Sequence, residues 1–209
     1  MKKLLLSVVA IVCITAASAQ THTLLIYANT YISSENSDYS SYQRKTIAWG
    51  PNLGVGYQLD HNMTIGIQGI YDFMKTPVGA AANNNFTISE WTLGAFYRYT
   101  IYTKTMLFFY AQVDAGYANG SASEEDLGAQ ATYTGFRGMV YPAIGAFVSP
   151  SIAVTFNVGG GSYRTYNWTA NYAGIENSNR SVLTFGRQFN LGVSKNIGWH
   201  PRHLKKHHQ

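Results

Sequence analysis

The feature that most limits the fold is a repeated alternation of apolar with small or polar residues, which runs through the chain beyond residue 20. In the segment 106–118, one face carries Leu107 and Phe109, whereas the other carries Gln112 and Asp114. A period of two predicts β-strands with two different faces, and no convincing helical period competes with it. We therefore expect an all-β fold whose eight strands span residues 23–33, 46–59, 63–73, 87–99, 106–118, 133–148, 152–161 and 182–197.

One face of the expected strands is apolar throughout, and the opposite face is small or polar. In the strand 46–59, Trp49 and Leu53 share one face, and Gly50 and Gly54 share the other. The interior of an eight-stranded barrel is only wide enough for packed side chains, so it cannot hold the large apolar groups of all eight strands. We therefore expect the apolar face to contact lipid in an eight-stranded antiparallel up-and-down transmembrane β-barrel, whose closure pairs every backbone group.

The expected connections alternate in length along the chain. Three are short and span residues 60–62, 101–105 and 149–151. Four are long, rich in Asn, Ser, Gly and Ala, and span residues 34–45, 74–86, 119–132 and 162–181. Outer-membrane barrels have short periplasmic turns and longer external loops, so this sorting predicts that the four long loops lie outside the cell.

The N-terminal residues predict export. A basic start, Met1 to Lys3, precedes an apolar run over residues 4–16 and the small residues Ala17, Ser18 and Ala19. This order is typical of a secretory signal peptide that is cut before residue 20. We expect a removed signal peptide at residues 1–19, a barrel at 20–199 and a basic periplasmic tail at 200–209. Because the single cysteine lies inside the expected signal peptide, we expect no disulfide in the mature chain.

The charge of the chain gives little support to a nucleic-acid partner. The formal net charge is +5, but five of the 15 basic residues lie in the expected signal peptide and tail, which leaves as many basic as acidic side chains between them. A neutral body is not typical of a nucleic-acid-binding protein. No apolar run is long enough for a transmembrane helix beyond the signal.

These features together resemble the outer-membrane β-barrel domain family, in particular the eight-stranded barrels of the OmpA- and OmpX-like class. The resemblance rests on the signal peptide, the eight alternating strands and a repeated Pro-x-x-Gly-x start of a strand at Pro51–Val55 and Pro142–Ala146. It covers almost all of the mature chain. It implies the outer membrane of a Gram-negative type of envelope, with membrane lipids and lipopolysaccharide as surroundings. Many members end on an aromatic residue, whereas here a basic tail follows Trp199.

Charged residues are expected on the inner face. The alternation points Asp72, Glu90, Arg98, Asp114 and Arg137 inward. We expect a direct ion pair of Arg137 with Asp114 or Glu90. One interpretation is a buried plug of ion pairs that fixes the packing of the lumen. The other is an ion or proton path, which the narrow interior of eight strands disfavours.

The sequence predicts neither a catalytic residue nor a cofactor or metal site. Some barrels of related size are enzymes whose catalytic His lies near the external rim or the outer part of the lipid face. The six His of this chain, at positions 22, 61, 200, 203, 207 and 208, are all expected on the periplasmic side. A metal site at His203, His207 and His208 is the alternative to a solvated tail, but no Cys or carboxylate accompanies them.

Aromatic residues and one arginine mark the outer end of the expected barrel. The aromatics of the expected external loops are either recognition anchors or rim residues at lipid headgroups, and they are Tyr39, Tyr42, Tyr163, Tyr166, Trp168 and Tyr172. Arg187 shares a face with apolar residues, so we place it at the external interface near lipid phosphates or at a bulge. Trp199 is expected at the opposite interface.

The function that fits these expectations best is a non-enzymatic outer-membrane barrel. It would act through its external loops or as an accessory subunit of a larger outer-membrane protein complex. A narrow porin-like channel is the first alternative, and an outer-membrane enzyme of unrecognised type is the second.

Overall fold

The computed structural model describes residues 23–39, 42–77, 85–124, 129–169, 178–183 and 189–198. These residues form ten antiparallel strands, which are β1 (Leu24–Tyr39), β2 (Tyr42–Gln58), β3 (Met63–Pro77), β4 (Asn85–Tyr102), β5 (Leu107–Glu124), β6 (Ala129–Ser149), β7 (Ile152–Asn157), β8 (Gly161–Trp168), β9 (Ser178–Leu183) and β10 (Phe189–Ile197). Within these ranges no helix has the length and apolar character needed to cross a membrane.

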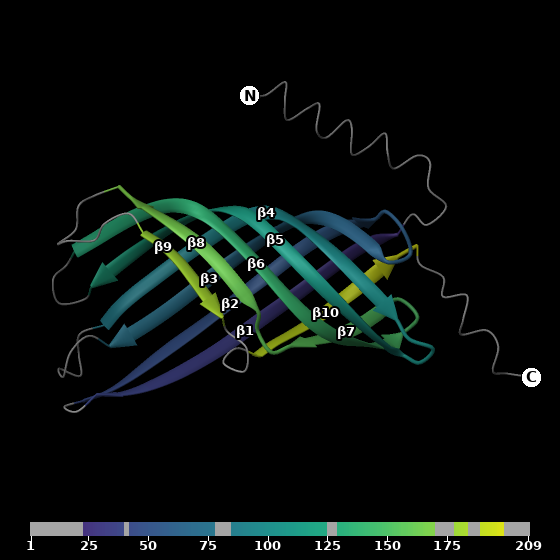
Figure 1. Ribbon diagram of the computed structural model, residues 1–209, viewed down its shortest axis with the longest axis horizontal. Coiled ribbons are helices and arrows are strands. Elements are labelled where there is room, and N and C mark those ends of the chain that lie inside the picture. Colours follow the sequence, from purple (N-terminus) through teal and green to yellow (C-terminus); the bar gives the residue numbers. More distant parts are fainter. Residues whose placement is uncertain are drawn as a thin grey trace, which may run out of the picture.

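The strands close into a ring of eight wall positions. β1 to β6 pair in sequence, β7 pairs with β6 and β10, and β10 returns to β1. β8 continues the line of β7 along β6, and β9 pairs with β8. Ten segments therefore occupy eight positions, and Figure 1 shows their arrangement around the barrel. The expected fold class, an eight-stranded antiparallel barrel, is confirmed.

The two ends of the barrel differ. The turns β2–β3, β4–β5 and β6–β7 lie at one end, together with the start of β1 and the finish of β10, where Leu24 pairs with Ile197 (right in Figure 1). We call this the short-turn end and the opposite one the long-loop end. At the long-loop end, β1 and β2 stay paired as far as Tyr39 and Tyr42.

The extents that the sequence predicts for the long loops are wrong, because the strands run further toward the long-loop end. Most residues of the ranges 34–45 and 119–132 continue the strands, as do residues 74–77 and 85–86, and the range 162–181 contains most of β8 and the start of β9. The physical reason is that ladder pairing uses backbone groups, so a strand can run past the apolar belt with Ser, Thr and Asn side chains. The polar composition of these runs resembles that of a loop, which is why the sequence predicts loops there.

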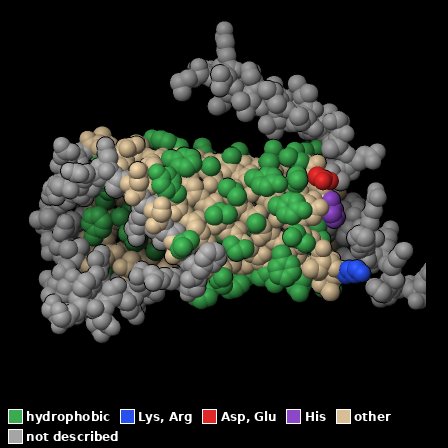
Figure 2. All heavy atoms as spheres, in the orientation of Figure 1, with side chains coloured by type: hydrophobic (Ala, Val, Ile, Leu, Met, Phe, Trp, Pro, Cys, Tyr) green, Lys and Arg blue, Asp and Glu red, His purple; other side chains and the backbone are tan. Residues whose placement is uncertain are grey.

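The two faces of the wall carry different side chains. The outer face is apolar over most of its height and includes Leu53, Ile67 and Leu93, each more than 60% exposed. Figure 2 shows hydrophobic side chains spread over the visible wall, with charged groups only near the short-turn end of that face. Six aromatic residues, between 40% and 52% exposed, edge this belt toward the long-loop end and form what we call the aromatic girdle: Trp49, Tyr71, Trp91, Tyr117, Phe136 and Tyr163.

The registers of β7 and β8 along β6 differ by one residue. Ile144 of β6 faces Phe156, so an unbroken ladder would place Val140 opposite Gly160, but Val140 faces Gly161 instead. The extra residue lies at Gly159, whose φ of 93° suits glycine, and at Gly160, where a Cβ would lie 2.1 Å from the carbonyl oxygen of Val140. This bulge exchanges the inner and outer faces between β7 and β8.

Candidate functional site

The upper lumen, toward the long-loop end, contains a cluster of four charged side chains. Arg137 of β6 forms ion pairs with Asp72 of β3 and, at 3.7 Å, with Glu90 of β4. Arg164 of β8 contacts the same two carboxylates, at 2.9 Å from Asp72 and 3.5 Å from Glu90. Two cations and two anions balance within this cluster, which we call the upper plug.

Two tyrosines donate hydrogen bonds to the carboxylates of the upper plug. The Tyr31 hydroxyl donates to Asp72 Oδ1 at 2.8 Å, and the Tyr133 hydroxyl donates to Glu90 Oε2 at 2.8 Å. Both carboxylates, together with Tyr133, are buried. A buried carboxylate with charged and phenolic donors on its oxygens is held in place. The arrangement crosslinks opposite walls of the barrel.

Of the two partners that we expected for Arg137, the structure pairs it with Glu90 and not with Asp114. Arg137 contacts Asp72 and Glu90, whereas Asp114 lies outside its ion-pair distance. In the register Asp114 faces Met139 and Arg137 faces Gly116, so the two residues are diagonal neighbours. The Arg137 guanidinium extends across the lumen to Asp72 and Glu90 instead.

Arg164 belongs to the upper plug, although the sequence analysis placed it in a loop. If the alternation of β7 continued unbroken, Arg164 would point to the outside of the wall. The bulge at Gly159 and Gly160 reverses the faces, so Arg164 points into the lumen. Three consecutive glycines at residues 159–161 were the signal that could have revealed the shift.

A second polar layer fills the middle of the lumen. Arg98 of β4 donates from Nε to Gln112 Oε1 at 2.7 Å, and its guanidinium carbon lies 4.2 Å from the ring centre of Tyr110 and 4.7 Å from that of Tyr27. Phe96 packs edge-on against Tyr27, with ring centres 5.2 Å apart. Arg98 thus has a cation–π partner on two sides and a side-chain amide as acceptor.

Asp114 lies in this middle layer and accepts only one hydrogen bond among the described residues. Gln112 Nε2 donates to Asp114 Oδ1 at 2.8 Å, while Oδ2 is buried without a partner in the described part of the chain. The same amide lies 3.2 Å from the Tyr27 hydroxyl and 3.4 Å from Gln68 Oε1. The residue therefore belongs to a network of amides and phenols.

Aromatic rings close the lumen toward the short-turn end. Phe108 lies 4.9 Å from Phe147 and 6.3 Å from Tyr110, ring centre to ring centre. Its ring also fills the space beside Gly145, where a Cβ would lie 2.1 Å from the Phe108 Cζ. Small inner residues therefore make room for large neighbours, and the space is not left open.

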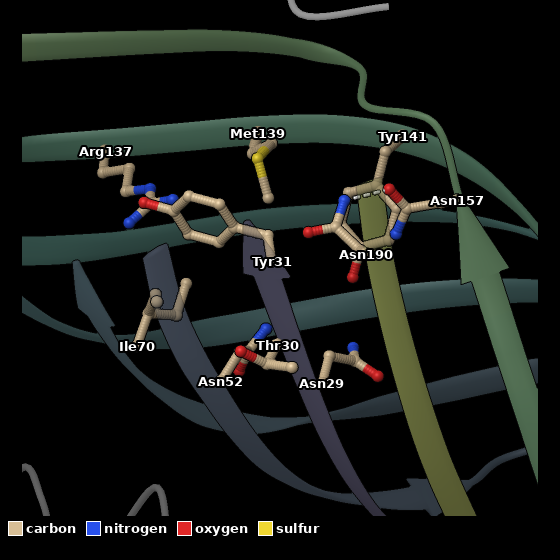
Figure 3. Close-up of a pocket in the computed structure, with 11 residues that line it drawn as sticks. Asn29, Thr30, Tyr31, Asn52, Ile70, Arg137, Met139, Tyr141, Asn157 and Asn190 are labelled. Atoms are coloured by element: carbon tan, nitrogen blue, oxygen red, sulfur yellow. Dashed lines mark hydrogen bonds between the residues drawn. The ribbon is translucent and has the colours of Figure 1, made fainter. Parts of the chain in front are cut away.

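Two small cavities lie beside these layers in the described part of the chain. The upper one offers ≈ 30 Å³ to the centres of water molecules, which is room for about two waters. Figure 3 shows its polar lining, in which Asn29 and Asn52 lie on one side and Asn157 and Asn190 on the other. The lower cavity offers ≈ 20 Å³ and is lined by Arg98 among others. Neither has room for an organic ligand.

The predicted outer aromatics fall into three groups. Tyr163 is an exposed outer-face residue of β8, whereas Tyr166 and Trp168 point inward and pack against Tyr133, with ring centres 5.1 Å and 4.8 Å away. Tyr166 and Trp168 are therefore wall residues of the upper lumen and not loop residues. Tyr39 and Tyr42 belong to paired strands, and their side chains lie outside the described part of the structure. Tyr172, Arg187 and Trp199 also lie outside the described residues.

Of the six His, only His61 lies in the described residues. It occupies the β2–β3 turn at the short-turn end, where its ring centre lies 4.9 Å from that of Tyr102. Among the described residues, no group of three or more His, Cys, Asp or Glu is placed to hold a metal ion.

No protein-family model matches the chain, and no curated protein matches it significantly. Among solved structures it is similar to Neisserial surface protein A, with a TM-score of 0.49 at 14% identity, covering 83% of this chain and 97% of that one. The outer membrane protein W of E. coli has a TM-score of 0.49 at 11% identity, with 86% and 100% covered. Ail, the attachment invasion locus protein of Yersinia pestis, has a TM-score of 0.46 at 12% identity, with 85% and 100% covered.

Proposed function

We propose that the protein is an outer-membrane β-barrel, exported by its signal peptide, whose long-loop end faces the outside of the cell. The observation that carries the proposal is the apolar outer face, which is edged by the aromatic girdle. In water, an apolar surface that surrounds the molecule is unfavourable, whereas in a bilayer it is the required contact surface. Tyr and Trp are typical of the two membrane–water interfaces.

We further propose a structural or binding role without catalysis or conduction. The upper plug, the Arg98 layer and the rings around Phe108 fill the lumen at three heights. Among the described residues, a lumen filled at three heights favours neither a substrate pocket nor a continuous water path, and we therefore propose the long-loop end and the outer face as the working surfaces. The protein acts alone through these surfaces or as an accessory subunit of a larger outer-membrane complex.

The second candidate function is a narrow channel, and the two polar cavities favour it. They lie along the lumen and have room for water. For conduction the upper plug and Arg98 would have to rearrange together, which costs several buried contacts. Conduction is therefore the less favoured reading.

Labelling of intact cells tests the membrane orientation. The only natural cysteine is in the expected signal peptide, so single cysteines can be introduced cleanly. With a membrane-impermeant maleimide, we expect Ser123→Cys, near the long-loop end of β5, to be labelled on intact cells. Lys104→Cys, in the exposed β4–β5 turn, should react only after the outer membrane is opened. The reverse pattern would overturn the orientation, and labelling of neither site in opened cells would overturn export to the envelope.

Purification from native membranes in mild detergent separates the two versions of the role. A partner that co-purifies in fixed ratio supports an accessory subunit, and a barrel that purifies alone supports an independent one. Membrane lipid and lipopolysaccharide are the surroundings that either version requires.

A further inference from the structure

Arg98 is a buried cation that no carboxylate of the described residues contacts directly. Its side chain belongs to the middle layer of the lumen, and the residue is only 4% exposed. The ion pairs that the described residues form all belong to Arg137 and Arg164 of the upper plug. A buried charge without an oppositely charged partner in contact is costly, so a counter-ion beside Arg98 would stabilise the folded barrel.

The guanidinium of Arg98 uses only part of its hydrogen-bonding capacity. Its Nε donates to Gln112, and the rings of Tyr27 and Tyr110 lie against it as uncharged cation–π partners. The terminal nitrogens, Nη1 and Nη2, donate no hydrogen bond to a described residue. Because a guanidinium carries five N–H donors, four of them remain available to a ligand.

The lower cavity lies beside Arg98. Gln112 and Asp114 are not among the residues that line this cavity, so the cavity is separate from the bridge that links Arg98 to the buried carboxylate of its own layer. Among the described residues that line it there is no carboxylate. Apart from Arg98, its polar lining consists of hydroxyl and amide side chains: Gln58, Thr64, Thr100, Tyr102, Ser194 and Asn196.

This lining offers more donors than acceptors. Thr64 and Ser194 are buried, and their hydroxyls make no hydrogen bond with a described side chain. Each of these hydroxyls can therefore turn its proton toward a ligand. The side-chain oxygen of Gln58 already accepts from Thr23. A positive charge surrounded by free donors disfavours a metal cation and favours an anion, which receives charge-assisted hydrogen bonds.

The size of the cavity limits the anion to a small one. The volume open to the centres of water molecules is ≈ 20 Å³, which is room for about one or two waters. A single halide ion fits this space, whereas a phosphate or an organic anion does not. Tyr102, Phe147 and Asn196 of the lining are half-buried and lie near the ends of their strands at the short-turn end. A small ion can therefore reach the cavity from that end without passing the upper plug.

We infer that the lower cavity is a binding site for one small monatomic anion of the chloride class. The terminal nitrogens of Arg98 supply the charge, and the hydroxyls of Thr64 and Ser194 supply further donors. The bound anion neutralises the guanidinium and holds it in the middle layer. The site goes beyond the proposed function, because it assigns a ligand to the lumen and does not depend on the orientation of the barrel in the membrane.

Two measurements on the full mature chain, refolded in detergent, test the site. The first compares the melting midpoint in sodium chloride and in sodium gluconate at equal ionic strength, since gluconate is too large for the cavity. A ligand that binds only the folded barrel raises its stability as the ligand concentration increases. The second is the anomalous scattering of bromide in crystals grown from sodium bromide, which locates the ion directly.

We expect chloride to raise the midpoint progressively, gluconate to leave it nearly unchanged, and bromide to lie within hydrogen-bond distance of Arg98 Nη1 or Nη2. The double variant Thr64→Val, Ser194→Ala keeps the guanidinium and should weaken chloride binding severalfold. Thr92→Val removes a buried hydroxyl of the upper lumen and is the matched control, which should keep the chloride effect. Arg98→Gln should abolish both the chloride effect and the bromide peak.

Equal midpoints in the two salts, together with no bromide in the cavity, would show that the cavity holds only water and would overturn the inference. A chloride effect that persists unchanged in Arg98→Gln and in the double variant would also overturn it, because the ion would then act elsewhere on the barrel. Bromide in the cavity without a chloride effect on the midpoint would mark an adventitious ion only, with the same consequence. If Arg98→Gln does not fold, the double variant and the bromide position decide.

Discussion

Arg164 of β8 lies 2.9 Å from Asp72 of β3, although 92 residues separate them and their strands face each other across the barrel. β8 pairs with β6 along one edge and with the short strand β9 along the other. The ion pair therefore adds a side-chain tie between β8 and the far wall, in a region where the backbone ladder is interrupted.

Replacement of Arg164 by leucine should loosen the barrel. The carboxylates of Asp72 and Glu90 would keep only Arg137 as a cationic partner. Loss of one member of a buried ion pair typically costs about 3–5 kcal/mol, and we expect a value at or below the lower end because Arg164 is 26% exposed. The midpoint of heat-modifiable gel migration measures the change. Lys75→Leu removes an outward charge and should shift the midpoint little; an equal shift for both variants would contradict the plug.

A double-mutant cycle should find that Arg137 is coupled to Asp72 and not to Asp114. Arg137 and Asp72 share a direct ion pair, whereas Asp114 contacts Gln112. The coupling energy of Arg137→Met with Asp72→Asn should exceed about 1 kcal/mol, since contacting charged residues couple strongly. The cycle with Asp114→Asn should give a value near zero. Urea titrations in lipid vesicles supply the free energies, and the opposite ranking would show that the side chains pair differently in the membrane.

Replacement of Gly160 by alanine should impair folding far more than the same change at Gly69. A Cβ at Gly160 would lie 2.1 Å from the Val140 carbonyl oxygen, and relief of this clash would move the backbone of the bulge. At Gly69, on the outer face, a Cβ meets nothing within 4 Å. The folded fraction on unheated gels after refolding into detergent compares the two. Similar folded fractions would show that the bulge tolerates a side chain.

The purified barrel should show no sustained conductance in a planar bilayer. The upper plug and the Arg98 layer block the lumen at two heights, and the two described cavities hold only a few waters. Stable single-channel steps that disappear in Asp114→Asn or Glu90→Gln would contradict this prediction. The channel would then become the preferred function.

The sequence predicted the eight wall positions because each alternating segment encodes its own strand and its own two faces. It did not predict that runs of small and polar residues such as 119–123 remain strand, since their composition alone resembles that of a loop. It placed Asp72, Glu90 and Arg137 on the inner face and named Glu90 as a possible partner of Arg137, but the ion pairs of Asp72 depend on side-chain reach across the lumen. The alternation of apolar and polar residues predicts which side chains share a face of the sheet. It does not predict which side chains meet across the lumen.

Because of the bulge at Gly159 and Gly160, the residues that face the lumen alternate in one phase along β7 and in the opposite phase along β8. Odd-numbered residues such as Thr155 face the lumen before it, and even-numbered residues such as Arg164 face the lumen after it. A related chain that lacks one residue here should carry its lumen-facing arginine one position out of phase, or lose it. If related chains that lack one residue at the bulge also move this arginine by one position, the bulge serves to point the arginine into the lumen.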